Sequence, residues 1–228
     1  MLMHFWSATK KLCFAGVLTC LSLWAHDSVG YGAPIGNAPP LIVTTYGTSL
    51  TSGGGWQAPL QRRLMDCASR PVIVHNRARA GASSRWGLQN IERVNHDRPD
   101  VVLIEFSIND AALNRMITPG ESRANMRGMV ERLRRQNPGV RIYFQAMSDG
   151  WGLRRWMRPM LDAYASDHRR LAAALGVGFV DHRPYWKSVS KRTRREIMPD
   201  GLHPLPQRSA ELTSARISEV VCRGLEGP

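Results

Sequence analysis

Short apolar runs alternate along this chain with stretches in which apolar residues recur at helical spacing. Five runs have the length and composition of buried β-strands, at residues 41–45, 72–75, 101–106, 141–147 and 177–181. Because strands that alternate with helices form parallel sheets covered on both faces, the pattern predicts a three-layer α/β/α fold. No internal repeat or long linker divides the 228 residues, so we expect a single domain.

Helical periodicity is clearest in the segment before the fourth predicted strand. Four apolar residues there follow the i, i+3, i+4, i+7 spacing of one helix face: Met126, Met129, Val130 and Leu133. Similar spacing predicts a shorter helix around residues 60–68, another over 157–175 and a final one over 207–223. We interpret the methionines on these faces as core residues.

Polar and small residues follow the predicted strands at the positions where parallel sheets bind ligands. Ser49 follows the first strand, Gly81 the second and Asn109 the third. The carboxyl ends of the strands should bring these three residues to one edge of the sheet. The loop at residues 148–151 follows the fourth strand and is expected at the same edge.

A serine, a histidine and an aspartate supply the groups needed for nucleophilic catalysis. A serine hydroxyl needs a base within hydrogen-bond reach, and an imidazole can accept and return a proton near neutral pH. His203 is the candidate base, and Asp200, three residues earlier, is the candidate for orienting its ring. Taken singly, each residue has another interpretation, because a serine after Gly47 is typical of a helix cap and His203 could be an ordinary loop residue.

The sequence resembles the SGNH, or GDSL, hydrolases over roughly residues 41–222. The matching blocks are Gly47-Thr48-Ser49-Leu50 for G-D-S-L, Gly81 for the glycine of the second block, Ser107-Ile108-Asn109-Asp110 for G-x-N-D, and Asp200-Gly201-Leu202-His203 for D-x-x-H. Two positions depart from the family pattern, with Thr48 in place of aspartate and Ser107 in place of glycine. The first should alter the turn around the serine, and the second should crowd the backbone near the oxyanion site.

This resemblance implies a flavodoxin-like sheet of five parallel strands in the order 2-1-3-4-5, and a serine hydrolase that needs neither a cofactor nor a metal. It assigns the nucleophile to Ser49, the general base to His203 and the orienting carboxylate to Asp200. It also assigns binding of the tetrahedral oxyanion to the backbone N–H groups of Ser49 and Gly81 and the side-chain amide of Asn109. From the residues alone, Gly81 could also be a turn glycine and Asn109 a loop cap.

Residues 1–33 have the order of a secretory signal. Two lysines precede an apolar stretch over residues 12–25, which is short for a membrane span, and small and polar residues follow it. We expect export to the periplasm or the medium, with no stable membrane insertion after cleavage. Residues 34–228 would then form the hydrolase domain. An uncleaved N-terminal anchor is the alternative.

The chain is strongly basic. Its formal net charge of +13 falls to +12 when the two lysines and one aspartate of residues 1–33 are removed. The arginines are scattered and accompany no zinc-finger, helix-turn-helix or RNA-binding signature, so we expect no nucleic-acid partner. The basic run at residues 191–195 is interpreted as a solvated face, with steering of an anionic substrate as the alternative.

Cysteine usage predicts a disulfide. Only Cys67 and Cys222 lie outside residues 1–33, and two thiols in an exported protein invite pairing. In a flavodoxin-like arrangement their helices lie on the same sheet face and run in the same direction, so we expect a bridge between them. The alternative is a buried Cys67 and an unpaired Cys222. Metal binding is not expected, because neither cysteine has His or Cys neighbours at ligand spacing.

Together these features predict an exported serine esterase that acts through an acyl-enzyme intermediate. Its substrate is expected to be a short-chain ester, above all an acetyl ester, carried by a small molecule or by an acylated carbohydrate. No long apolar segment typical of a lipase lid follows residues 1–33. Trp151 is predicted to bind substrate by packing against a sugar ring, although Trp151, Trp56 and Trp186 could each be core residues instead. Two alternatives stay open: an O-acyltransferase that acts on a polysaccharide, and a polysaccharide-binding protein on an inactivated hydrolase scaffold.

Overall fold

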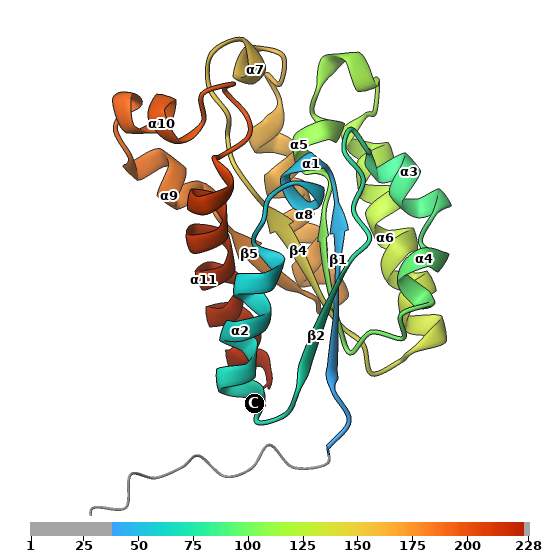
Figure 1. Cartoon of the computed structure of the whole chain (residues 1–228). Helices are drawn as coiled ribbons and strands as arrows, with labels where there is room; N and C mark the ends of the chain where they lie inside the picture. The colour runs from blue at the N-terminus through green and yellow to red at the C-terminus, as the bar shows by residue number, and fades with distance from the viewer. Residues whose placement is uncertain (1–37, 226–228) are drawn as a thin grey trace, which may run out of the picture. The chain divides into compact units, whose positions relative to one another are not determined.

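The computed structural model describes residues 38–225, and the predicted signal or anchor at residues 1–33 lies outside them. Five strands form one parallel sheet in the order β2-β1-β3-β4-β5, which confirms the predicted fold (Figure 1). The strands are β1 (Leu41–Gly47), β2 (Val72–Asn76), β3 (Val101–Glu105), β4 (Arg141–Ala146) and β5 (Gly178–Asp181).

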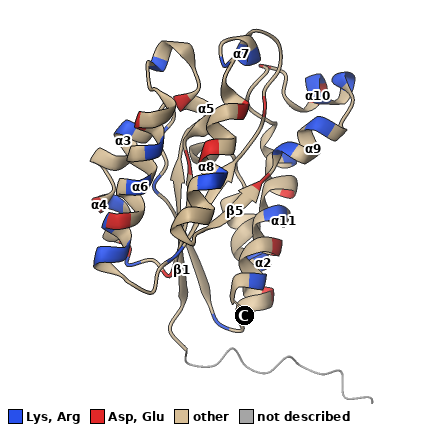
Figure 2. Ribbon diagram, turned by 180° about the vertical axis from the view of Figure 1, so that it is seen from behind, with Lys and Arg blue, Asp and Glu red and all other residues tan. Residues whose placement is uncertain are grey.

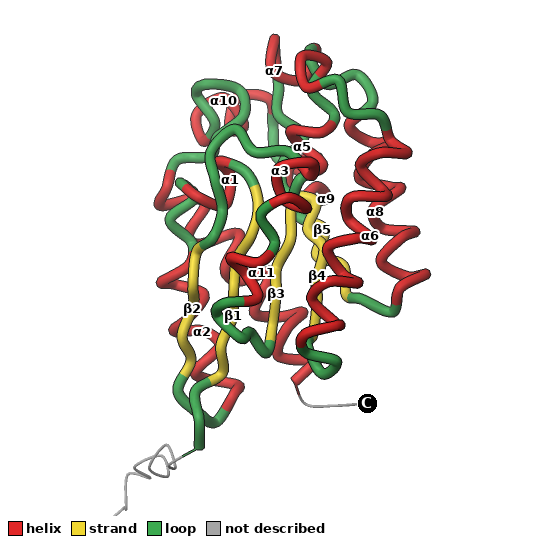
Figure 3. The backbone as a smooth tube through the Cα atoms, turned by 90° about the vertical axis from the view of Figure 1, so that its right-hand side faces the viewer, coloured by secondary structure: helices red, strands yellow, loops and turns green. Residues whose placement is uncertain are grey.

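Helices cover both faces of the sheet (Figure 1, Figure 3). On one face, α2 (Gln57–Ala68) packs against α11 (Pro206–Leu225). On the other, α6 (Pro119–Gln136) packs between α3 (Ser84–Gln89) and α8 (Leu161–Leu175). The shorter helical segments are α1 (Ser49–Ser52), α4 (Glu92–Asn95), α5 (Ser107–Asp110), η1 (Leu113–Arg115), α7 (Gly152–Trp156), α9 (Arg183–Ser188) and α10 (Lys191–Ile197). None of the helices within residues 38–225 is both long enough and apolar enough to cross a membrane.

The central strand β3 is buried along its whole length. Its side chains alternate between the two layers, since Val101 and Leu103 belong to the apolar cluster under α2 and α11, and Val102 and Ile104 to the cluster under α6 and α8. This two-sided burial explains why β3 reads as a continuous apolar run.

The register of the sheet brings two functional turns together. Gly47, the last residue of β1, lies opposite Glu105, the last residue of β3. The chain turns into α1 directly after Gly47 and into α5 directly after Phe106. The turn that carries Ser49 and the turn that carries Asn109 therefore leave the sheet side by side.

The predicted helix over residues 157–175 begins later than expected. The structure has the short α7, then a turn, and only at Leu161 the start of α8. Pro159 gives the reason, because it has no N–H to donate and disfavours helical backbone in the residue before it. As a consequence Met160 is exposed instead of lying in the core.

A disulfide between Cys67 and Cys222 joins α2 to α11, as predicted. The two Cα atoms are 5.8 Å apart, and the bridge closes a loop between residues separated by 155 positions in the sequence. Each cysteine lies near the carboxyl end of its helix. The bridge therefore fixes the ends of both helices of this layer.

Candidate active site

The turn after β1 presents Ser49 at the first position of α1. Thr48 caps this short helix with an extended backbone, and its side-chain oxygen accepts a hydrogen bond from the N–H of Leu50. The serine is both a helix-start residue and half-buried at the edge of the sheet. The local sequence thus aims its hydroxyl away from the core.

His203 returns to this turn from the loop that precedes α11. Its Nε2 lies 2.7 Å from Ser49 Oγ, and its Nδ1 lies 2.6 Å from Asp200 Oδ2. The imidazole stands between a hydroxyl and a carboxylate in one hydrogen-bonded line. The structure therefore brings together the three residues that the sequence pattern assigned to a triad.

Asp200 is held by the backbone as well as by the imidazole. Its Oδ1 accepts hydrogen bonds from the N–H groups of Leu202, at 2.9 Å, and His203, at 2.7 Å. Partial burial opposes ionisation, but the hydrogen bonds from the His203 ring and from these N–H groups outweigh it and lower the pKa of Asp200 to about 2. The carboxylate is therefore ionised at neutral pH and can stabilise an imidazolium.

Gly81 and Asn109 border the same cavity as Ser49 and His203. Gly81 has a φ of +75°, a conformation in which other residues are strained. The Asn109 side-chain amide donates one hydrogen bond to the carbonyl of Ala82 at 2.8 Å, which fixes the amide and leaves its second hydrogen available. Within residues 38–225, the N–H groups of Ser49 and Gly81 have no acceptor. Three donors are thus available beside the serine.

Asp110 holds the loop that follows Gly81 in place. Its Oδ1 accepts a hydrogen bond from the N–H of Ser84 at 2.8 Å, and its Oδ2 accepts one from the Ser122 hydroxyl at 2.6 Å. The Ser122 oxygen also lies 2.8 Å from Nε2 of the buried His168. These contacts tie α3, α5, α6 and α8 together, so Asp110 supports the site structurally.

The cavity beside Ser49 has a volume of about 330 Å³ and a mostly polar lining. It is lined by Ser49, Gly81, Asn109, Asn114, Arg115, Arg154, Met157, Arg158, Leu202 and His203. Sequence reasoning missed the three arginines, although Arg154 and Arg158 follow the loop that was expected at this edge. Among the described residues, no group of three or more His, Cys, Asp or Glu is arranged to hold a metal ion.

Trp151 does not line this cavity, in contrast to its predicted contact with substrate. Its indole N–H donates a hydrogen bond to the carbonyl of Met198 at 2.7 Å, and its ring packs on the cluster formed by Trp186, Ile197 and Met198. Trp56 is fully buried and Trp186 nearly so. On α7, Trp156 is exposed and lies two residues after the cavity-lining Arg154 in sequence.

The basic run at residues 191–195 forms most of α10 and also stays outside the cavity. Arg192 pairs with Glu196 at 2.9 Å, and the guanidinium of Arg195 lies 5.6 Å from the centroid of the Trp151 ring. Figure 2 shows Lys and Arg spread over the helices among Asp and Glu. These contacts are typical of a solvated face.

Glu105, at the end of β3, is a buried carboxylate that sequence reasoning missed. Its Oε1 accepts hydrogen bonds from the N–H and hydroxyl of Thr48, at 2.6 and 2.8 Å, and from the Thr51 hydroxyl at 2.9 Å. Its Oε2 is buried without a partner among the described residues. Burial outweighs the hydrogen bonds and raises the pKa of Glu105 to about 7. A glutamate ending an apolar strand was the signal that could have revealed it.

Glu105 gives a physical reason for Thr48 at the position where the family pattern has aspartate. The Thr48 hydroxyl donates to Glu105, whereas an aspartate there would place a second carboxylate beside a buried one. A glycine is required at position 47, because a Cβ there would lie 2.6 Å from the backbone carbonyl oxygen of Glu105. The other departure, Ser107, is buried at the start of α5 and does not line the cavity.

Replacing Glu105 by glutamine should reduce the dependence of stability on pH between about 4.5 and 7. The folded-state pKa of about 7 lies above the ordinary value of 4.5. The contribution of Glu105 is therefore fully present below about 4.5 and falls as the pH rises through 7, by about 3 kcal/mol. Glutamine stays neutral and keeps an acceptor for Thr48 and Thr51.

Denaturant unfolding of both proteins at about pH 5 and about pH 8 would measure this effect. The free energy of unfolding of the variant minus that of the wild type should be more positive at the higher pH. The subtraction cancels the opposing contributions of His168 and His182, whose pKa values burial lowers to about 4. A difference that does not change with pH would show that Glu105 does not titrate in this window.

A parallel α/β/α sheet with a Ser–His–Asp line at the carboxyl ends of its strands defines a serine hydrolase. The model of the GDSL-like lipase/acylhydrolase family matches residues 28–207, and the chain belongs to this family. The protein is accordingly an ester hydrolase of the GDSL, or SGNH, type.

Several solved structures share this fold. The lipase/acylhydrolase from Enterococcus faecalis matches with a TM-score of 0.69 and 22% identity, over 80% of this chain and 96% of that one. A putative GDSL-like lipase from Parabacteroides merdae matches with a TM-score of 0.70 and 18% identity, over 82% of this chain and 100% of that one. A catalytic mutant of an acetylxylan esterase from Geobacillus stearothermophilus matches with a TM-score of 0.66 and 19% identity, over 79% of this chain and 93% of that one. A comparison with curated protein sequences finds no significant match.

Proposed function

We propose that this protein is an exported serine esterase that hydrolyses short-chain esters, above all acetyl esters on carbohydrates, through an acyl-enzyme intermediate. The observation that carries the proposal is the hydrogen-bonded line from Ser49 through His203 to Asp200. Export is supported by the signal-like order of residues 1–33 and by the disulfide, since disulfides persist in oxidising compartments.

In the acylation step, Ser49 Oγ attacks the ester carbonyl carbon while its proton passes to Nε2 of His203. Asp200 accepts the hydrogen bond from Nδ1–H and stabilises the imidazolium without taking the proton. The tetrahedral intermediate then collapses, the bond from carbon to the alcohol oxygen breaks, and Nε2 returns the proton to the leaving alkoxide. The products are the free alcohol and an acyl ester on Ser49.

In the deacylation step, water takes the place of the alcohol. His203 accepts a proton from the water as its oxygen attacks the acyl carbon, and a second tetrahedral intermediate forms. Its collapse breaks the bond to Ser49 Oγ, which recovers its proton from His203. The carboxylic acid leaves and the enzyme is restored.

Both intermediates place negative charge on the former carbonyl oxygen. The N–H groups of Ser49 and Gly81 and the amide of Asn109 are the donors proposed to meet it. A donor that is already oriented needs no rearrangement during the reaction, and loss of one such donor typically costs about 3 kcal/mol of transition-state stabilisation. The bond from Asn109 to Ala82 supplies this orientation.

The lining of the cavity supports a short acyl group. Met157 and Leu202 are its apolar side chains, and the other side chains are polar or cationic. A methylene gains about 0.8 kcal/mol only when it is buried against apolar surface, so a longer chain would gain little from this lining. Trp156 is exposed on α7, two residues after the cavity-lining Arg154, and offers an aromatic face to a sugar ring.

A second candidate function is hydrolysis of longer-chain amphiphilic esters. Exposed apolar side chains gather on the two segments that border the cavity, namely Leu113, Met116, Leu153, Trp156 and Met160. An exposed apolar patch of this kind is typical of a surface that meets an apolar partner. Acyl-chain preference separates the two functions.

We expect kcat/KM to fall as the acyl chain of a set of aryl esters lengthens from acetyl through butyryl to octanoyl and palmitoyl. An octanoyl chain would have to cover polar and cationic lining groups and remove them from water, which should reduce kcat/KM by about tenfold or more relative to acetyl esters. Acetate release from O-acetylated xylan fragments tests the carbohydrate part of the proposal. A preference for octanoyl or longer chains, without acetate release from any glycan, would instead establish the amphiphile as substrate.

A further inference from the structure

Three arginines line the cavity of the nucleophile, and we propose that they bind an anionic substituent, a carboxylate or a phosphate, that the substrate carries beside its ester. This inference rests on the proposed esterase function and names its substrate class. Arg115 comes from η1, Arg154 from α7 and Arg158 from the turn after α7. Two separate segments thus bring positive charge to one small cavity.

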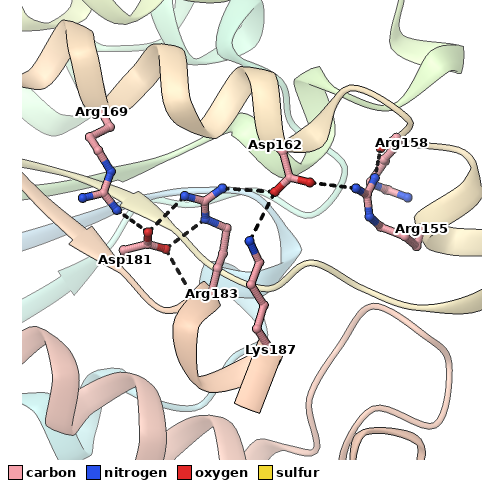
Figure 4. A network of polar contacts seen from close by, with 7 residues as sticks. All are labelled: Arg155, Arg158, Asp162, Arg169, Asp181, Arg183 and Lys187. Atoms are coloured by element: carbon pink, nitrogen blue, oxygen red, sulfur yellow. Dashed lines mark hydrogen bonds and ion pairs between the residues drawn. The ribbon is translucent and has the colours of Figure 1, made fainter. Parts of the chain in front are cut away.

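The positive charge of the three arginines is not paired within the described part of the chain. Among the described residues, none of the three arginines forms an ion pair with an aspartate or glutamate. Arg155, between Arg154 and Arg158 in sequence, does not line the cavity and pairs with Asp162 at 3.0 Å (Figure 4). The same figure shows Arg183 bound to Asp181. Within residues 38–225, the nearby Arg155 and Arg183 thus have carboxylate partners, whereas the three arginines of the cavity have none.

Arg158 is the fixed member of the group. Its side chain is only 5% exposed, its Nε donates to the carbonyl of Ile108 at 2.7 Å, and its Nη1 donates to the carbonyl of Arg154 at 2.8 Å. Its Nη2 has no acceptor among the described residues. Burial, with the positive charges of Arg154 and Arg115, lowers the pKa of Arg158. A buried cation among like charges is costly, and a bound anion would relieve that cost.

Arg115 places the charge next to the reacting carbonyl. Its Nη2 lies 3.3 Å from the position that a Cβ on Gly81 would occupy, and Gly81 carries one of the proposed oxyanion donors. The side chain is exposed, like that of Arg154, so both can move onto a ligand while Arg158 stays in place. A guanidinium binds a carboxylate or phosphate through two parallel hydrogen bonds, which fixes orientation as well as charge.

The position of the arginines limits where the anionic group can lie on the substrate. All three share with Ser49 a cavity of about 330 Å³, which is too small to separate ester and anion by more than about one sugar ring. The substrate class is therefore an acetylated sugar that carries its acidic group on the same ring or on the adjoining one. This property would distinguish the protein from esterases that act on neutral glycans.

The test compares three substrates acetylated at the same hydroxyl: a methyl glucoside, the matching glucuronoside and the matching glucoside phosphate. For the wild type we expect kcat/KM for one or both anionic substrates to exceed that for the neutral one by about 10- to 100-fold. The ratio should fall towards one in Arg115→Gln and Arg154→Gln, and also at high salt. The two anionic substrates distinguish a carboxylate site from a phosphate site.

Two further variants make the result specific. Arg192→Gln, which removes a positive charge from α10 that does not line the cavity, should keep the wild-type ratio. Arg158→Lys retains the charge but loses the planar fork, so it should lower the ratio without the loss of packing that a small residue would cause. Binding of the intact substrates to Ser49→Ala, measured by calorimetry, gives the corresponding ratio of dissociation constants and needs no catalysis.

The outcomes separate this inference from the esterase function. Equal kcat/KM and equal affinity for neutral and anionic sugars would overturn the anion site and leave the esterase intact. Equal losses on all three substrates in Arg115→Gln would also overturn it, because the arginine would then stabilise the oxyanion itself. If no ester is hydrolysed and a phosphonate fails to label Ser49, the esterase function fails, while the calorimetric ratio still decides whether the anion site exists.

Discussion

Replacing Ser49 by alanine should lower ester hydrolysis by on the order of 10⁴-fold or more, with the fold intact. The variant loses the atom that forms the acyl-enzyme, and the remaining groups can only assist direct attack by water. His203→Ala should cost about as much, because its Nε2 is the base 2.7 Å from the serine hydroxyl. Turnover of an aryl acetate by each purified variant, with circular dichroism as the control for folding, measures the effect.

The double variant gives the sharper test. Because the serine and the imidazole act as one unit, Ser49→Ala with His203→Ala should be no slower than either single variant. Asn109→Ala should differ in kind, losing about 10²- to 10³-fold while still forming a covalent adduct with a phosphonate. Wild-type turnover in Ser49→Ala would rule out the covalent mechanism, and additive losses would show that the two residues act independently.

Removal of the disulfide should have the largest effect on stability. The bridge joins residues separated by 155 positions, and closure of so long a loop restricts the unfolded chain strongly. The entropic model predicts a loss of about 4 to 5 kcal/mol for Cys67→Ser with Cys222→Ser. For a domain of this size the melting temperature should fall by about 10 to 20 °C.

Reducing conditions supply the matched control. A reductant should lower the melting temperature of the wild type to that of the double variant and should leave the double variant unchanged. Peptide mapping without reduction should recover Cys67 and Cys222 in one linked fragment. Equal melting temperatures for the oxidised wild type and the double variant would show that the bridge contributes nothing to stability.

The sheet illustrates what local pattern encodes. All five strands were predicted within a few residues of their observed bounds, because buried parallel strands require apolar runs that are visible in sequence. The start of α8 was misplaced, since helical spacing continued through Pro159 while the backbone could not. Pattern gives the periodicity of an element, and one residue without an N–H can end it.

The triad illustrates what the order of short motifs along the chain encodes. Ser49, Asp200 and His203 were chosen from sequence, and the structure places them in hydrogen-bond contact. Chain topology accounts for Ser49, because a residue that follows a parallel strand lies at the carboxyl edge of the sheet. Asp200 and His203 reach the same edge from the loop between α10 and α11. The roles of Gly81 and Asn109 stay predictions that rest on their place beside the cavity.

By itself, the sequence determined the parallel α/β sheet and brought Ser49, Gly81 and Asn109 to its edge, because each follows from strand order and from which residues end a strand. It predicted the pairing of Cys67 with Cys222 but left the unpaired alternative open, and the tertiary structure decided for the bridge. Only the tertiary structure decided which side chains face the cavity. It turned Trp151 towards Met198, buried Glu105 against Thr48, and gathered three arginines around the nucleophile. The physical reason is that side-chain direction and burial depend on packing between segments far apart in the chain, which no local pattern contains.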